Sequence, residues 1–424
     1  MRRVLLLATT TGYQTRMFGE AAAALGVELV FATDRCDQLE DPWWDGAIPV
    51  RFHEETAAVA AIVAAARTAP VDGIIAVGDR ATLLAAAIAK ELGLPGHPPH
   101  AARAARDKRL MREHFQRAGL RAPSFCVFPR VRDPHRIAAE LSWPVVVKPT
   151  VLSGSRGVIR ANNASEFIAA FTRVQRLLAA TDIRAMQDPA AEEILVEQFI
   201  EGAELAVEGV LEHGALRILA IFDKPDPLDG PFFEETLYVT PSRAARPVRE
   251  AITAAVSAAA QALGLWHGPI HAECRVNPRG VFVLEVAARP IGGLCAQVLR
   301  VTRRGGAPVA YEGLLLRHAI GESLADWDRE SAAAGVMMVP IPVEGVYRRV
   351  AGVDRALRVS GVHDVRITAK ADQHLIPLPE GASYLGFIFA SAETPDEVEH
   401  ALREAHGCLS FVIDRAIAVT RTRE

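Results

Sequence analysis

The sequence predicts a multidomain protein in which an N-terminal α/β domain is followed by α+β regions. The chain has 424 residues, more than one ordinary hydrophobic core accommodates. Short apolar runs alternate with helical stretches as far as about residue 96, which is typical of a parallel sheet. From residue 124 onward the strands have hairpin spacing with helices between them, which favours α+β architecture.

The first 96 residues contain the parallel-sheet pattern. Apolar strands are expected at 4–8, 29–32 and 73–77, with helices from 14 to 25 and from about 80 to 92. Ligands on such sheets bind beyond the C-terminal strand ends, where the loops Thr9–Tyr13 and Gly78–Arg80 lie. No GxGxxG follows the first strand, which argues against a dinucleotide fingerprint.

A proline-rich stretch at 94–99 marks a boundary. A basic helix is expected next, from about 100 to 118, with Gly119 at its C-terminal cap. The last third predicts a strand at 384–389 and a helix at 395–406. We therefore divide the chain into 1–96, 97–303 (with a small subdomain at about 124–193) and 304–424.

The segment from His271 to Ala287 carries the main chemical signal. Two alternating strands flank Asn277-Pro278-Arg279-Gly280, and a three-residue loop at 278–280 would place Glu273 directly opposite Glu285. Adjacent carboxylates repel unless a cation lies between them, and Mg²⁺ prefers carboxylate and phosphate oxygens. The pattern predicts a core face with Ala272, Cys274, Val276, Phe282, Leu284 and Val286. The opposite face carries His271, Glu273, Arg275, Val281, Val283, Glu285 and Ala287.

Two alternatives remain open for this hairpin. Arg275 could neutralise one carboxylate on a solvated face, and a four-residue loop would move the two glutamates to opposite faces.

A second feature is a loop of small residues between two strands. Val145–Pro149 ends in Lys148-Pro149 and is followed by Ser153-Gly154-Ser155-Arg156-Gly157. Small residues let backbone N–H groups approach phosphate oxygens, and Lys148 can reach the same phosphates. GxxxxGK[ST] is absent, so this is not a Walker A loop, and an ordinary hairpin loop remains the alternative.

A third feature is an apolar strand that leads into Glu197-Gln198-Phe199-Ile200-Glu201-Gly202 and then Glu204. A hinge backbone of this kind can pair with an adenine edge, and a carboxylate can accept hydrogen bonds from ribose hydroxyls. A plain strand–turn–strand element would give the same pattern.

In this order, the motifs resemble the ATP-grasp superfamily, and most of all its L-amino acid ligase branch. The resemblance covers essentially the whole chain, including Arg106-Asp107-Lys108 and the final-third run 384–390. It implies an ATP-grasp fold with an N-terminal pre-ATP-grasp domain, and it implies ATP and Mg²⁺, with Mn²⁺ as an alternative metal.

The resemblance also implies roles for individual residues. Arg289 and Lys148 would be catalytic, and Glu273 and Glu285 would hold the metal. Nucleotide contacts would come from Lys108, Lys148, Ser153, Gly154, Ser155, Gly157, Glu197, Phe199 and Glu204. Candidate substrate contacts are His271, Glu235, Gly292 and Gly293, with 224–235 as a substrate-side loop or, alternatively, a surface loop. For Arg289, the alternative is a salt bridge to one of the glutamates.

One position departs from the family pattern. The last metal motif usually reads Glu-x-Asn, whereas this chain has Glu285-Val286-Ala287. The expected register places Ala287 opposite His271, so that His271 or water would occupy the vacated space. Imidazole is a poor Mg²⁺ ligand, which favours water. His271 could instead bind phosphate or substrate, or be a hydrogen-bonded structural histidine.

Composition restricts the partners and the location. The formal charge of −4 gives no basic field for nucleic acid or an anionic membrane, and no apolar run reaches the ~20 residues of a membrane helix. Five scattered cysteines without a CxxC favour reduced thiols and a cytoplasmic location. We expect small-molecule carboxylate and amine substrates, and a homodimer is compatible with the sequence.

The implied reaction forms an amide through an acyl phosphate, with release of ADP and phosphate. The product would be of the amino-acid or dipeptide type. Two alternatives stay open: another ATP-grasp enzyme of the purine-pathway or carboxylase-like kind, and an impaired ATP-binding protein, which the missing asparagine suggests.

Overall fold

The computed structural model describes residues 1–8, 13–34 and 47–415. Most of the expected loop Thr9–Tyr13, and Cys36, lie outside the described residues. Within the described ranges the chain forms three larger sheets and two small ones. No helix in the described part of the chain is long and apolar enough to cross a membrane.

The N-terminal sheet is parallel, as the sequence predicts, with strand order β3-β2-β1-β4. Residues of β1 are almost fully buried, because helices and the rest of the molecule cover both faces of the sheet. Its elements are β1 (Arg3–Ala8), α1 (Tyr13–Leu25), β2 (Glu28–Asp34), β3 (Ile48–Val50), α2 (Glu55–Thr68), β4 (Gly73–Val77) and α3 (Asp79–Leu92).

The expected single basic helix at 100–118 is wrong, because the structure has two. Helix α4 (Pro99–Arg106) ends at Asp107, and α5 (Lys108–Arg117) begins after it. The Asp107 side chain accepts hydrogen bonds from the backbone N–H groups of Arg109 and Leu110, which is an N-cap. This cap fixes Lys108 at the first position of α5. After the end of this helix, Gly119 has the left-handed backbone conformation, with φ +66°.

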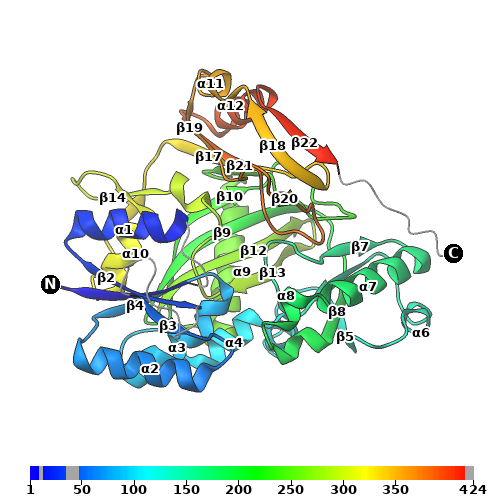
Figure 1. Ribbon diagram of the computed structural model, residues 1–424, viewed down its shortest axis with the longest axis horizontal. Coiled ribbons are helices and arrows are strands. Elements are labelled where there is room, and N and C mark those ends of the chain that lie inside the picture. Colours follow the sequence, from blue (N-terminus) through cyan, green and yellow to red (C-terminus); the bar gives the residue numbers. More distant parts are fainter. Residues whose placement is uncertain (9–12, 35–46, 416–424) are drawn as a thin grey trace.

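A small antiparallel sheet with order β5-β8-β6-β7 forms a separate lobe, at the lower right of Figure 1. Helix α7 packs on it through the buried residues Phe167, Phe171 and Val174. The elements are β5 (Phe125–Pro129), α6 (Pro134–Ala138), β6 (Val145–Pro149), β7 (Ile159–Ala161), α7 (Ala164–Leu178), α8 (Thr181–Arg184), η1 (Pro189–Glu192) and β8 (Glu193–Gln198).

The central sheet has eight strands in the order β13-β12-β9-β10-β11-β17-β21-β19, and it crosses the proposed boundary at residue 303. Its paired strands are antiparallel. The first half comprises β9 (Ala203–Glu212), β10 (Ala215–Asp223), β11 (Leu237–Thr240), α9 (Arg246–Leu263), β12 (Gly268–Asn277) and β13 (Gly280–Ala287).

The C-terminal third completes this sheet and adds two three-stranded sheets, β15-β14-β16 and β20-β18-β22. Its elements are η2 (Cys295–Val298), β14 (Arg300–Arg303), β15 (Val309–Ala310), α10 (Tyr311–Ala319), β16 (Trp327–Arg329), β17 (Ala333–Val339), β18 (Gly345–Ala351), α11 (Val353–Ala356), β19 (Val362–Ile367), β20 (His374–Leu375), β21 (Gly386–Ala392), α12 (Pro395–Gly407) and β22 (Ser410–Arg415).

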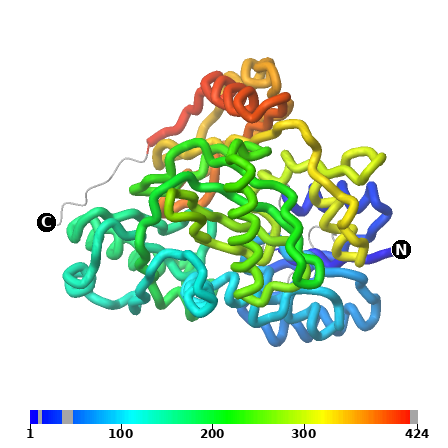
Figure 2. The backbone as a smooth tube through the Cα atoms, turned by 180° about the vertical axis from the view of Figure 1, so that it is seen from behind, coloured from blue at the N-terminus to red at the C-terminus, as the bar shows by residue number. Residues whose placement is uncertain are grey.

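The hydrophobic cores show which faces meet. One core joins Val4 and Leu6 of β1 to Phe222 of β10 and Val336 of β17, so the N-terminal domain packs directly against the central sheet. A second core lies under α4, α5 and α9 on β12 and β13. Seen from behind, the small lobe and the N-terminal domain lie on opposite sides of the central sheet (Figure 2).

Candidate active site

A cavity of about 630 Å³ lies where the small lobe, the central sheet, the N-terminal domain and the C-terminal third meet. The predicted site residues that line it are Lys108, Lys148, Ser153, Gly154, Ser155, Glu197, Phe199, Glu204, Glu235, His271, Glu273, Glu285, Arg289, Gly292 and Gly293. Gly157 is not part of this lining. These predicted residues lie up to 185 positions apart in the sequence, from Lys108 to Gly293, and the fold brings them into one cavity.

The hairpin β12–β13 pairs Glu273 with Glu285, as predicted, but the turn and the register near it differ from the prediction. The turn has two residues, because Asn277 pairs with Gly280, and a bulge between Glu273 and Cys274 restores the alignment. The predicted faces are therefore wrong for residues 281–284. Val281 and Val283 are in the core with Cys274, whereas Leu284 lines the cavity beside Glu285.

Glu273 and Glu285 contact different cations. Lys108 Nζ lies 3.3 Å from Glu285 Oε2, and Lys224 Nζ lies 3.3 Å from Glu273 Oε1. Each glutamate side chain remains 25% exposed toward the cavity. Arg275 does not neutralise either of them, since its Nε donates to Glu204 at 2.9 Å.

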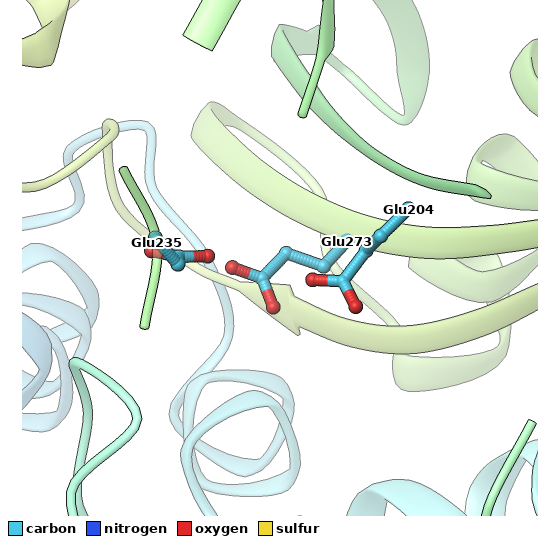
Figure 3. A group of neighbouring side chains, drawn as sticks. All are labelled: Glu204, Glu235 and Glu273. Atoms are coloured by element: carbon cyan, nitrogen blue, oxygen red, sulfur yellow. The ribbon is translucent and has the colours of Figure 1, made fainter. Parts of the chain in front are cut away.

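Glu273 also belongs to a second group of carboxylates, with Glu204 and Glu235 (Figure 3). One oxygen of each lies within 4.8 Å of the others. Burial alone would raise the pKa of Glu273, but Lys224 and His271 hold that pKa well below its usual range. Burial raises the pKa of Glu235, although Lys224 opposes the rise. The two carboxyls thus differ in their tendency to hold a proton.

Glu197, which also lines the cavity, joins two cations. Arg112 Nε donates to Glu197 Oε2 at 2.9 Å, and Lys148 Nζ contacts Glu197 Oε1. Burial would raise the pKa of Glu197, but the two cations lower it to about 2. The expected role of Glu197 concerned only its backbone; its side chain is a counter-ion that holds Lys148 at the cavity wall.

The small-residue loop lies over this region. Ser153, Gly154 and Ser155 line the cavity, and the carbonyl of Leu152 accepts a hydrogen bond of 2.9 Å from Lys108 Nζ. Gly157 lies behind, where a Cβ would come within 2.9 Å of Pro149. The Gly157 N–H donates to the carbonyl of Pro379, so the C-terminal third contacts this loop.

Phe199 and Glu204 follow the small lobe at the cavity edge. Phe199 is buried, with the guanidinium groups of Arg160 and Arg275 at 4.0 and 4.8 Å from its ring centre. Glu204 accepts from Arg275 and, at 2.9 Å, from Lys224. The expected ribose acceptor is therefore already in an ion-pair network.

Arg289 forms its salt bridge with Asp79, not with a glutamate. Its Nε and one terminal nitrogen donate to the two carboxylate oxygens of Asp79 at 2.8 and 3.1 Å. Burial would lower the pKa of Arg289, but Asp79 keeps it above its ordinary value. Asp79 begins α3 in the predicted loop Gly78–Arg80, yet nothing in the sequence points to Arg289 as its partner.

His271 is fixed by a buried carboxylate that the sequence did not reveal. Its Nδ1 lies 2.9 Å from Glu208 Oε2, and its Nε2 lies 3.8 Å from Glu273 Oε1. Burial would lower the pKa of His271, but Glu208 and Glu273 raise it to about 9. Ala287 pairs with His271, as expected. Glu208 is the register partner of His271 on the neighbouring strand β9. Their proximity therefore follows from how the two strands pair.

The segment 224–235 contributes two cavity residues, Phe233 and Glu235. Phe232 does not line this cavity; its backbone bridges to Ile159 of the small lobe, and the Arg173 guanidinium lies 5.1 Å from its ring centre. Near Gly292 and Gly293, the C-terminal third adds a largely apolar wall that the sequence analysis did not identify, formed by Cys295, Met338, Tyr384 and Phe387.

The donor set fits a hard divalent cation. Glu273 and Glu285 face each other across the hairpin, open toward the cavity, and supply carboxylate oxygens only. Mg²⁺ prefers one or two carboxylates together with phosphate oxygens. Lys108 and Lys148 lie at the same cavity and can neutralise those phosphates.

Three family models match the chain in succession. The ATP-grasp N-terminal domain matches residues 19–96, the ATP-grasp domain 141–298, and the L-amino acid ligase C-terminal domain 2 residues 337–414. An L-amino acid ligase from Bacillus licheniformis has a similar structure, with a TM-score of 0.81 and 26% identity, over 98% of this chain and 99% of that one.

Two curated relatives match shorter parts of their own length. The uncharacterised protein y4rH of Sinorhizobium fredii is 25% identical over 332 residues, 75% of this chain and 63% of that protein. Alanine–anticapsin ligase of Bacillus amyloliquefaciens is 30% identical over 215 residues, 48% of this chain and 45% of that protein. The chain therefore spans less than two thirds of these curated relatives.

Proposed function

Because the chain belongs to the ATP-grasp superfamily, we propose that it is an ATP-dependent ligase that joins a carboxylate to an amine. The cavity supports this most directly. Lys108 contacts Glu285, one of the paired carboxylates Glu273 and Glu285, and Lys148 lines the same cavity. Such a combination suits a metal-bound polyphosphate, because the lysines neutralise phosphate oxygens and the carboxylates hold the metal.

The reaction requires activation of a carboxylate, which is a poor acyl donor by itself. A carboxylate oxygen bonds to the γ-phosphorus of ATP, the bridging P–O bond breaks, and ADP leaves. The amine nitrogen then bonds to the acyl carbon of the acyl phosphate. Phosphate departs with the former carboxylate oxygen, and the nitrogen gives up a proton.

The chain's own residues supply binding and electrostatic stabilisation. Lys108 and Lys148 would bind phosphate oxygens, and the loop Ser153–Ser155 would offer backbone N–H groups. Arg289 would stabilise negative charge on the transferring phosphoryl group. Glu273 and Glu285 would hold Mg²⁺ or Mn²⁺, which supplies Lewis-acid stabilisation of phosphate charge.

Water must be kept away from the acyl phosphate. The small-residue loop already contacts the C-terminal third: the Gly157 N–H donates to the Pro379 carbonyl, and Arg156 Nε donates to the Glu380 carbonyl at 2.7 Å. These contacts hold the loop over the cavity and support its role as a cover.

We propose amino acids as the substrate class. An L-amino acid ligase of similar structure and the relative named alanine–anticapsin ligase support this choice. His271, Glu235, Gly292 and Gly293 are candidate substrate contacts, because they line the cavity beside Arg289. The cytoplasmic location and a homodimer remain expectations from the sequence.

The test is amine-dependent release of ADP over a panel of amino acids, with mass spectrometry of the product. We expect stoichiometric ADP, phosphate and amide for at least one pair. Turnover without an amide for any pair would favour another ATP-grasp reaction. ATP binding without turnover would favour the impaired ATP-binding protein.

A further inference from the structure

Lys224, the first residue after β10, places its ammonium group among three glutamates that line the cavity. Its Nζ lies 2.9 Å from Glu204 Oε1 and 3.3 Å from Glu273 Oε1, and it also contacts Glu235 Oε1. The Lys224 side chain is only 3% exposed. An ammonium group has three N–H donors, and here three carboxylates surround it.

The three glutamates come from separate parts of the fold. Glu204 is the second residue of β9, Glu235 precedes β11, and Glu273 is on β12, where it pairs with Glu285. Without a cation, three carboxylates this close and this poorly solvated would repel strongly. Arg275 reaches only Glu204, through Oε2. Among the described residues, Lys224 alone forms ion pairs with all three glutamates.

We infer that Lys224 is a positioning residue whose ammonium group is the resident cation of the Glu204–Glu235–Glu273 cluster and keeps divalent metal out of it. The oxygens of this cluster lie close enough together to ligate one metal ion. A divalent ion and an ammonium group cannot occupy the same space. Metal binding is thereby directed to the other side of Glu273, toward Glu285.

The contacts of Glu273 agree with this division. Lys224 Nζ and His271 Nε2 both face its Oε1, at 3.3 and 3.8 Å. Oε2 would then be the oxygen of Glu273 that remains to hold a metal together with Glu285. Lys224 would act on the metal site through Glu273, without contacting substrate.

The test measures metal binding and stability without nucleotide, so it does not depend on the proposed reaction. Lys224→Met keeps much of the side-chain length and removes the charge, whereas Lys224→Arg keeps the charge. Lys90→Met, at an exposed position on α3, is the control. Mn²⁺ binding is followed by electron paramagnetic resonance, and thermal unfolding is followed with EDTA or with Mn²⁺.

In EDTA, Lys224→Met should unfold about 5 °C or more below the wild type, because three buried carboxylates lose their cation. Mn²⁺ should restore most of that loss, and the variant should bind one more Mn²⁺ than the wild type. Lys224→Arg and Lys90→Met should gain no Mn²⁺ site. A folded Lys224→Met with wild-type Mn²⁺ stoichiometry and no Mn²⁺-dependent stabilisation would overturn the inference.

A double variant covers the case in which Lys224→Met does not fold. Lys224→Met/Glu235→Gln removes one of the repelling carboxylates along with the ammonium group. It should recover soluble, folded protein in EDTA. A double variant that is no more soluble than Lys224→Met would contradict the role of Lys224 as the cluster's cation.

Discussion

Arg289, two residues after β13 ends, donates two hydrogen bonds to Asp79 at the start of α3 in the N-terminal domain. The pair joins the end of the β12–β13 hairpin to the N-terminal domain, and its two residues lie 210 positions apart in the chain. It holds the guanidinium group in one orientation at the cavity wall. The N-terminal domain therefore contributes to the proposed catalytic geometry, and not only to the core.

Replacement of Arg289 tests its proposed role in phosphoryl transfer. Arg289→Met should lower kcat about 10²- to 10³-fold and change the KM for ATP little, because the lost stabilisation belongs to the transition state. Arg289→Lys should recover only part of the loss, since lysine lacks the planar fork. Steady-state kinetics check this, with Arg246→Met on exposed α9 surface as the control. A kcat above one tenth of the wild-type value in Arg289→Met would contradict the role.

The paired glutamates should control metal dependence. Glu273→Gln and Glu285→Gln each remove a charged oxygen ligand and should raise the Mg²⁺ concentration for half-maximal activity at least about tenfold. Activity is measured across a Mg²⁺ titration at saturating ATP. Glu250→Gln, on the surface of α9, should match the wild type. An unchanged Mg²⁺ requirement in both site variants would place the metal elsewhere.

His271 should make a stabilising contribution that depends on pH. Its pKa is raised from 6.5 to about 9, because Glu208 and Glu273 outweigh the effect of burial. The contribution is therefore fully present below pH 6.5 and is lost as the pH rises through 9. The difference in free energy of unfolding between wild type and His271→Gln should be largest near pH 6 and shrink by about 3 kcal/mol toward pH 9.5. Urea denaturation at several pH values measures it, and a constant difference would show that the Glu208 contact does not favour the charged ring.

Glu197 should be important for stability as well as for binding. Glu197→Gln leaves the buried guanidinium of Arg112 and the ammonium of Lys148 without a negative partner. We expect a loss of about 3–5 kcal/mol in the free energy of unfolding. Glu192→Gln, which breaks the more exposed pair with Arg130, should cost less than about 1 kcal/mol. Similar losses in the two variants would mean that the Glu197 network is no stronger than a surface pair.

The sequence predicted features that depend on local pattern. Parallel strands in the first domain followed from short apolar runs between helices. The Glu273–Glu285 pairing followed from strand alternation around a turn. Even there two local details were missed: the turn is shorter, and a bulge compensates for it. The pattern of apolar residues alone predicted one helix across Asp107. In the structure a new helix starts there, because the Asp107 side chain caps the N-terminus of α5.

Long-range ion pairs could not be predicted in this way. Asp79 with Arg289, Lys224 with three glutamates, and Glu208 with His271 each join residues from different elements. These pairs depend on how the sheets and domains pack, and residue spacing along the chain does not predict that packing. In the sequence Lys224 is only the first residue of a candidate loop, whereas in the structure it contacts three glutamates.

The path of one oxygen atom tests the proposed ligase most directly. The amino acid that supplies the carboxylate is labelled with ¹⁸O in that group, and the released phosphate is analysed by mass spectrometry after turnover with ATP and the amine. Ligation through an acyl phosphate predicts that one ¹⁸O atom appears in the phosphate for each amide formed. Amide formation with unlabelled phosphate would contradict carboxylate activation by phosphoryl transfer.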